Sequence, residues 1–421
     1  MSRRSGPAGH PLVERERPPG GRRRGLLGLI LVGLAACGAP AKDGTGGDAD
    51  DTADGLTGLE QVLLALTEDP DAALLDVSRT TGWPAPVDGG WLFVTTEPGA
   101  WSVAGDFEGW AGLPMTEEAG YSWLVANVPD ASGYKFTDGT NWAADPWSRQ
   151  YTYDDFGEMS LLNAEDAHLE RLFAVSDGTL AARTVRAWVP AEPATHVLYV
   201  HDGQNLFDPG ASWGGWHLQD SVPAAMLVVG IDNTAARMDE YTHVPDSLDG
   251  ETYGGQGDAY AAFLEGTVRP LADATWGEPA TVGVMGSSLG GLISFHVADR
   301  APGEYAFAAS LSGTMGWGSI GADNETMIAR YAAAGHRGTA LYLDSGGYGT
   351  TCADADGDGT HDDDPDAADN YCETAQLRDV LEAGGYTFDV DLFHWHEPGA
   401  EHNEAAWADR VWRPMEIFAV L

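Results

Sequence analysis

One stretch, Gly283 to Phe295 (GVMGSSLGGLISF), restricts the fold of this 421-residue chain more than any other. It carries two adjacent serines, Ser287 and Ser288, among four glycines. Regular structure tolerates glycine at this density only where the backbone turns sharply or approaches something closely. The apolar residues before the serines predict a buried strand, and those after them predict a helix. The stretch therefore predicts a sharp strand-to-helix turn that presents a serine.

The glycines indicate which serine is presented. In a G-x-S-x-G turn, the residues two before and two after the serine come so close that side chains there would collide. Around Ser287 these positions hold methionine and leucine, whereas around Ser288 they hold Gly286 and Gly290. The sequence therefore predicts Ser288 as a nucleophile.

A serine nucleophile needs a base, and in an α/β-hydrolase the chain order is serine, acid, histidine. Of the histidines downstream of the turn, His361, His394, His396 and His402 are the candidates for this base. His361 lies in an acidic insert, and the next two alternate in a predicted strand, which suits packing or the lining of a pocket. His402 follows the last predicted strand, in a loop before the closing helix, and is the predicted base.

The rest of the chain supports an α/β fold. From about residue 169, near-continuous apolar strands such as HVLYVHDG and AMLVVGIDN alternate with helical segments, which predicts a mostly parallel sheet covered on both faces. Short alternating stretches from about residue 82 predict a small immunoglobulin-like antiparallel β-sandwich before it. The expected divisions are a signal peptide (1–36), an acidic tether (37–57), a short helical segment (58–82), the sandwich (83–162) and an α/β-hydrolase catalytic domain (163–421) with an acidic insert (350–372).

The N-terminal residues predict export. Three arginines at 22–24 precede the apolar run GLLGLILVGLAA, which is too short to span a membrane permanently. The run ends in Leu-Ala-Ala-Cys, which resembles a bacterial lipobox with Cys37 as the lipidated residue; an ordinary signal peptide is the alternative. We expect a protein that is lipid-anchored to a bacterial membrane, periplasmic or at the cell surface.

Charge and cysteine content agree with this location. The formal charge of −43 argues against nucleic acid and anionic membrane surfaces as partners, so a lipid anchor is the only membrane contact expected. Besides Cys37 the chain has only Cys352 and Cys372, which bracket the irregular acidic insert. In an oxidising compartment this pair is expected to form a disulfide.

Four motifs, in order, resemble the "Putative esterase" family of α/β-hydrolases, a group similar to siderophore esterases and feruloyl esterases. The motifs are LYVHDGQNLFD, VVGIDN followed by Arg237, GSSLGGL and EHNEAAWADR, and the resemblance covers about Arg183 to the C-terminus. It implies an oxyanion site made by the backbone N–H groups of Gln204 and Leu289. No cofactor is expected for catalysis.

The acid is harder to assign. It should follow the strand TALYLD, but the position that the family uses, a few residues beyond the glycine pair, carries no carboxylate here. Asp344 at the end of the strand is the first choice, and Asp369 after the insert is the second. The resemblance also allows a serine–histidine pair without a close acid.

The acidic insert resembles calcium loops of the D-x-D-x-D-G type, in which a tight turn gathers several oxygen ligands. It lacks the glutamate of an EF-hand at position twelve, where Pro365 stands, and it lacks flanking helices. A solvated acidic loop is the alternative. The predicted structural calcium ligands are the side chains of Asp354, Asp356, Asp358 and Asp362 and the carbonyl of Thr360.

The motifs GDFEGW, YKFTDG and NWAADP resemble the early-set sandwich related to family 48 carbohydrate-binding modules. Trp110, Trp123 and Trp142 could stack on sugar rings. We expect them instead to pack in the core and against the next domain, because a small sandwich needs large core side chains.

Together these features predict an exported serine esterase. Its expected substrate is an acylated carbohydrate, of feruloyl or acetyl type, or a siderophore lactone. Two alternatives remain: a non-catalytic glycan-binding surface lipoprotein on a hydrolase scaffold, and an acyltransferase.

Overall fold

The computed structural model describes residues 58–118, 120–348, 351–363 and 369–421. The chain divides into two compact units, Met1–Gly55 and Leu56–Leu421, and every described residue lies in the second. The predicted signal peptide, Cys37 and the acidic tether lie outside the described residues. None of the described helices is long and apolar enough to cross a membrane.

Two short helices, α1 (Gly58–Glu68) and α2 (Pro70–Arg79), begin the described chain. Asp69 caps α2, because its carboxylate accepts the N–H of Ala72 at 3.1 Å. Pro70 follows in the first turn, where the missing N–H of proline removes no helical hydrogen bond. Apolar side chains of both helices pack on the first sheet of the β-sandwich.

The β-sandwich consists of two antiparallel layers with a shared aromatic core. In that core the rings of Phe93 and Tyr134 meet edge to face, with 5.0 Å between centroids. The first sheet has the order β1 (Ala85–Val87), β2 (Gly90–Thr95), β6 (Tyr121–Ala126), β5 (Thr116–Glu118). The second contains β4 (Leu113–Pro114), β3 (Ser102–Gly105), β7 (Ser132–Thr137), β10 (Gly157–Leu162) and β9 (Gln150–Asp154), with β8 (Trp142–Ala143) paired to β7.

The second sheet continues into the C-terminal α/β part of the chain. β11 (His168–Val175) pairs with β9 through Leu169 opposite Tyr151, and with β12 (Arg183–Val189) on its other side. The resulting 14-stranded sheet runs in the order β20-β19-β18-β17-β13-β14-β12-β11-β9-β10-β7-β3-β4, with β8 off this path. The domain boundary expected near residue 162 falls between β10 and β11.

The C-terminal part of the sheet is parallel from β14 to β20. Its strands are near-continuous apolar runs; in β14 (MLVVGI) every residue is buried, as expected for a strand covered on both faces. The parallel strands are β14 (Met226–Ile231), β13 (His196–His201), β17 (Thr281–Ser287), β18 (Phe307–Leu311), β19 (Ala340–Ser345) and β20 (Leu392–His396).

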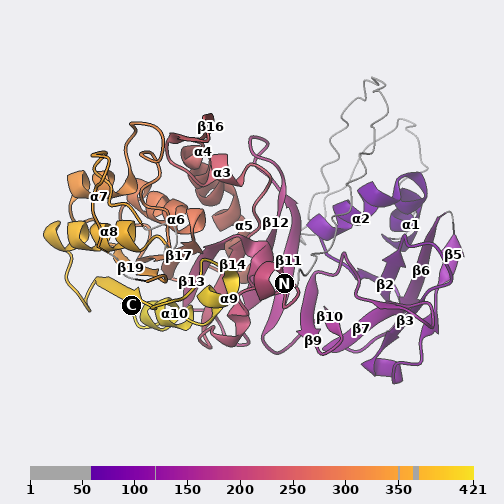
Figure 1. Cartoon of the computed structure of the whole chain (residues 1–421). Helices are drawn as coiled ribbons and strands as arrows, with labels where there is room; N and C mark the ends of the chain where they lie inside the picture. The colour runs from indigo at the N-terminus through magenta and orange to yellow at the C-terminus, as the bar shows by residue number, and fades with distance from the viewer. Residues whose placement is uncertain (1–57, 119, 349–350, 364–368) are drawn as a thin grey trace, which may run out of the picture. The chain divides into compact units, whose positions relative to one another are not determined.

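Helices cover both faces of this sheet, as Figure 1 shows with α6, α7 and α8 on one side and α9 and α10 on the other. The expected α/β fold with helices on both faces is therefore confirmed. One face carries α4 (Gly257–Phe263), a π-helical turn (Leu264–Val268), α5 (Arg269–Trp276), α6 (Leu289–Arg300), α7 (Met327–Ala334) and α8 (Tyr371–Ala383). The other carries α9 (Glu404–Ala408) and α10 (Trp412–Phe418).

The connections add short elements between the strands. The carboxyl ends of parallel strands meet at one edge of a sheet, so the loops that follow them are brought together there. The short elements are the 3-10 turns η1 (Asp106–Glu108), η2 (Gly203–Asn205), η3 (Ser212–Gly214) and η4 (Leu218–Asp220), helix α3 (Arg237–Glu240), and the hairpin β15 (Pro245–Leu248) with β16 (Glu251–Gly254).

Candidate active site

Ser288 occupies the turn between β17 and α6. Its φ of 54° and ψ of −125° lie in a region that a residue with a side chain rarely adopts. A Cβ atom built on Gly286 would lie 2.6 Å from the carbonyl carbon and oxygen of Gly290, so a side chain at this position could not fit. The sharp turn and the close glycines that the sequence predicts around Ser288 are thus present, and such strain is typical of functional positions.

Ser288 and His402 line the same pocket, which has a volume of about 330 Å³. His402 directly precedes α9, where the side chain of Asn403 caps the helix by accepting the N–H of Ala406 at 3.0 Å. The aromatic lining comes from Trp213, Trp216 and Trp407.

His402 has a buried carboxylate partner, Asp369. The His402 Nδ1 to Asp369 Oδ1 distance is 2.6 Å, and the Asp369 side chain is fully buried. The ring also meets Trp407 edge to face at 5.0 Å between centroids. With Nδ1 donating to the carboxylate, Nε2 is the nitrogen that can take a proton from a hydroxyl group.

Asp344, the first choice for the acid, does not contact His402. The structure thus reverses the preference between Asp344 and Asp369 that the sequence suggested. The Asp344 carboxylate accepts hydrogen bonds from Arg410 Nε at 3.0 Å and from the Tyr342 hydroxyl at 2.9 Å. Burial raises its pKa to about 6. Asp369, the second choice, faces His402 instead, because the chain returns from the acidic insert to the end of β19 before α8 begins.

The two predicted oxyanion donors follow neighbouring parallel strands. Gln204 lies in η2 after β13, and Leu289 begins α6, where helical N–H groups have no acceptor one turn earlier. The turns touch, since a Cβ on Gly290 would lie 3.3 Å from Asp202 Oδ2. Position 203 has no room for a side chain either, because a Cβ on Gly203 would be 2.7 Å from the carbonyl carbon of Gly230.

A polar network, not assigned a role from the sequence, holds the turn after β13. Asp202 accepts two hydrogen bonds from Arg237, at 2.8 and 2.7 Å, and one from Asn233 at 2.5 Å. Asn205 donates to Glu404 at 3.0 Å, and burial raises the pKa of that carboxyl group. Arg237 follows one of the recognised motifs, which is the signal that could have identified this network.

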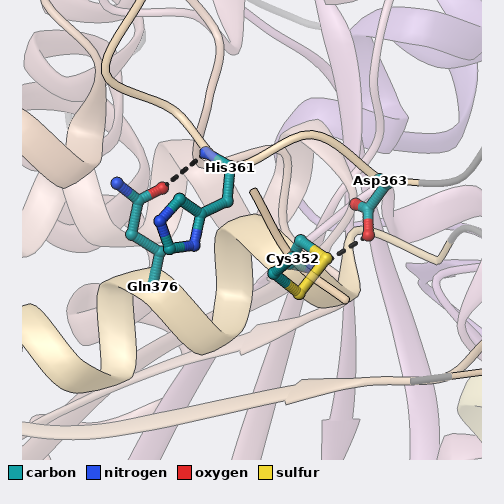
Figure 2. The surroundings of a disulfide bond; sticks show 5 residues. Cys352, His361, Asp363 and Gln376 are labelled. Carbon is teal, nitrogen blue, oxygen red and sulfur yellow. Dashed lines mark hydrogen bonds between the residues drawn. A yellow bond between two sulfur atoms is a disulfide. The ribbon is translucent and has the colours of Figure 1, made fainter. Parts of the chain in front are cut away.

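Cys352 and Cys372 form the predicted disulfide, with 5.3 Å between their Cα atoms. Figure 2 shows the neighbouring contacts, in which the backbone N–H of His361 donates to Gln376 Oε1 at 2.8 Å. Asp363 accepts the backbone N–H of Cys372, also at 2.8 Å. The disulfide and these hydrogen bonds attach the insert to α8, which begins two residues after Asp369.

Three of the five predicted calcium ligands come together. The carboxylates of Asp354, Asp356 and Asp358 are exposed and offer oxygens that lie within 4.8 Å of one another. Asp362 instead accepts the N–H of Ala355 at 2.8 Å. Calcium binding, and the part of the Thr360 carbonyl in it, stays a prediction.

The β-sandwich has an aromatic cleft of about 750 Å³. Trp110 is 37% exposed, Trp142 50% and Phe156 88%. The expectation that the tryptophans pack in the core is therefore wrong for Trp110 and Trp142; Trp123 is half-buried in the core cluster beside α1 and α2. The cleft residues are Trp110, Lys135, Trp142, Asp154, Phe156 and Met159.

Comparison with known proteins identifies one family. A family model described as "Putative esterase" matches residues 182–413. An uncharacterized protein of Bacillus subtilis (strain 168), YbbA, is 30% identical over 123 residues, which are 28% of this chain and 49% of that protein. The chain thus spans about half the length of this curated relative.

Solved structures resemble the chain more distantly. The enterobactin esterase FES of Shigella flexneri is 15% identical, with 78% of this chain and 92% of that chain covered and a TM-score of 0.43. An IroE-like serine hydrolase from Shewanella oneidensis is 14% identical, with 60% and 80% covered and a TM-score of 0.44. Siderophore hydrolase EstB from Aspergillus nidulans is 15% identical, with 59% and 94% covered and a TM-score of 0.42. Similarity at this level supports no inference about activity.

Proposed function

Because the chain belongs to the "Putative esterase" family, we propose that it is an exported serine esterase that cleaves a carboxylic ester through an acyl-enzyme. The observation that carries the proposal is the pocket that Ser288 shares with His402, whose other ring nitrogen meets the buried Asp369 at 2.6 Å. The disulfide between Cys352 and Cys372 supports export, because such bonds persist in oxidising compartments.

The proposed reaction begins when Ser288 Oγ attacks the ester carbonyl while His402 Nε2 takes the hydroxyl proton. Asp369 holds the ring and stabilises the imidazolium that forms. The tetrahedral oxyanion receives hydrogen bonds from the N–H groups of Gln204 and Leu289. Collapse breaks the ester C–O bond, and His402 returns the proton to the departing alcohol. Water then repeats the sequence on the acyl-serine and releases the acid.

We propose an acylated carbohydrate, with a feruloyl or acetyl group, as the substrate class. Trp110, Trp142 and Phe156 expose aromatic surface in the sandwich cleft, and faces of this kind bind the C–H side of pyranose rings. Three aromatic side chains that line one open cleft offer a surface on which a sugar ring can stack.

The charge of the chain weighs against the siderophore alternative. Glu404 adds a carboxylate to the pocket wall, and the whole chain carries a formal charge of −43. Catecholate siderophores carry a net negative charge when they hold iron, so such complexes would be repelled, whereas an uncharged acyl sugar would not.

The proposal is tested by hydrolysis of p-nitrophenyl acetate with the full chain purified in detergent, beside Ser288→Ala and Ser287→Ala. Turnover that disappears only in Ser288→Ala identifies the nucleophile, and Ser287→Ala is the matched control. Feruloyl and acetyl sugars, then a siderophore lactone, compare the two substrate classes.

A wild type no faster than Ser288→Ala on all these esters contradicts the esterase proposal. Retention on an acylated glycan column without turnover would then favour the glycan-binding alternative, for which the aromatic cleft is the specific observation. Product esters formed with an added acceptor sugar would indicate acyl transfer.

A further inference from the structure

Behind the His402–Asp369 pair lies a buried cation, Arg410, between α9 and α10. Its side chain is 1% exposed, and its Nη1 donates to the carbonyl of Ala406 at 3.0 Å. Its Nε donates to Asp344 at 3.0 Å, and its Nη2 lies 3.4 Å from Asp369 Oδ2. One guanidinium group therefore contacts two carboxylates that are both fully buried.

Ser312 joins the same cation to the same acid. Arg410 Nη2 donates to Ser312 Oγ at 2.6 Å, and this hydroxyl donates to Asp369 Oδ2, also at 2.6 Å. Trp407 Nε1 donates to Ser312 Oγ at 3.2 Å. The Asp369 oxygen that these groups hold is not the one that meets His402, so they set the direction of the carboxylate without competing for the imidazole.

We propose that Arg410 is a positioning residue for the reaction, which keeps Asp369 ionised and aimed at His402, with Asp344 as its second counter-charge. This inference rests on the proposed esterase function. Arg410 acts through Asp369 and touches no substrate atom.

The charges around Asp369 show why it needs this cation. From β19 the facing groups are Asp344 and Tyr342, and from the insert it is Asp363, whose carboxylate repels Asp369. From the loop before α9 the facing group is His402. A buried carboxylate among other carboxylates takes up a proton unless a cation and hydrogen bonds hold it ionised.

The test is the pH profile of kcat/KM on p-nitrophenyl acetate, measured with the full chain in detergent. Arg410→Met removes the positive charge beside the His402–Asp369 pair. The midpoint of the acid limb should therefore move up by about one pH unit. We expect kcat near neutral pH to fall about tenfold, with KM unchanged, because the general base is then less available.

A second variant separates charge from packing. Arg410→Met combined with Asp344→Asn loses one cation and one anion together, so the midpoint should return towards the wild-type value and kcat should partly recover. Arg410→Lys keeps the charge and should keep the midpoint. Arg413→Met is the matched control, since Arg413 stacks over Trp395 at 3.5 Å.

The proposal is overturned if the acid-limb midpoint of Arg410→Met equals that of the wild type. It is also overturned if the double variant has a lower kcat than Arg410→Met. Either result would mean that Arg410 only packs. Should Arg410→Met fail to fold, Asp344→Asn alone decides. Loss of that anion should move the midpoint down, and an unchanged midpoint contradicts the proposal. Failure of the proposed esterase function gives a different result, because the wild type would then turn over p-nitrophenyl acetate no faster than Ser288→Ala.

Discussion

At the scale of single residues, the site depends on which carboxylate meets His402. Asp344 and Asp369 are both fully buried, and both contact Arg410. Only Asp369 reaches the imidazole, at 2.6 Å, whereas Asp344 is occupied by the Tyr342 hydroxyl and the Arg410 guanidinium. Two acids of similar burial thus have different hydrogen-bond partners, and we expect their functions to differ accordingly.

Asp369→Asn should reduce kcat on p-nitrophenyl acetate by about 10³–10⁴-fold, because an amide there disturbs the tautomer of His402 and does not stabilise its charged form. Asp344→Asn should lower kcat less than tenfold, since that side chain contacts Arg410 and Tyr342 and not His402. Steady-state kinetics of the two variants measure the difference. Equal losses in both would contradict the assignment of Asp369.

A second expectation concerns pH and a buried glutamate, Glu373. Burial raises its pKa to about 8 from the ordinary value of 4.5, while its carboxylate accepts the backbone N–H of Gly316. The folded chain therefore holds a proton that the unfolded chain releases. The stability from this proton is fully present below about pH 4.5 and is lost as the pH rises through about 8.

Glu373→Gln cannot lose that proton, so its Tm should match the wild type near pH 4.5 and exceed it at about pH 8 and above. Each pKa unit of difference corresponds to about 1.4 kcal/mol, so the gap should be readily measurable. Thermal unfolding of both proteins across this pH range gives the comparison. A gap that does not change with pH would show that Glu373 ionises in the folded chain as it does in the unfolded one.

At the scale of elements, the first turn of α8 connects the acidic insert with the active site. Asn370 precedes the helix with a φ of 54°, and Asp369 lies three residues before Cys372. The disulfide and the Asp363 contact both reach Cys372 in this turn, and Asp369, which contacts Ser312 and His402, lies just before it. Loosening the insert should therefore affect catalysis as well as stability.

Replacement of both Cys352 and Cys372 by serine should lower the free energy of unfolding by about 3 kcal/mol, because the unfolded chain regains the loop entropy. We also expect a lower kcat with KM unchanged, since Asp369 is then held less firmly against His402. Denaturant unfolding and kinetics measure the two effects. A variant that loses stability but keeps full kcat would show that the insert and the site are independent.

At the scale of the whole molecule, the 14-stranded sheet joins the sandwich strands to the catalytic strands through β9 and β11. The aromatic cleft belongs to the sandwich, and the pocket with Ser288 belongs to the catalytic strands. The proposal thus assigns binding of the glycan to the sandwich cleft and cleavage of its ester to the pocket with Ser288. Each activity can be tested without the other.

Trp110→Ala combined with Trp142→Ala should weaken binding to an acylated glycan at least tenfold, because stacking of each ring contributes about 1 kcal/mol or more. Turnover of p-nitrophenyl acetate should not change. Affinity electrophoresis in the glycan and kinetics on the small ester measure the two properties. The control is Trp412→Ala, which removes a tryptophan of similar exposure, 40%, from α10. Unchanged glycan binding in the double variant would remove the main support for a carbohydrate substrate.

Local features of the sequence determined the α/β class, the strained turn at Ser288 and the disulfide. Apolar runs, glycine spacing and an isolated cysteine pair act over short stretches, so their consequences can be derived from the residues themselves. The same applies to His402, whose loop follows the last strand.

Only the tertiary structure decided which acid meets His402, which arginine lies behind it and which tryptophans are exposed. Asp369 and Arg410 are separated from Ser288 by about 80 and 120 residues in the chain, and their contacts depend on how the insert returns to β19 and how α10 closes the sheet. Trp110 and Trp142 lie in a fold whose core is filled by Phe93, Tyr134 and Phe136 instead. Contacts across such distances follow from the path of the whole chain, which no local pattern of residues records.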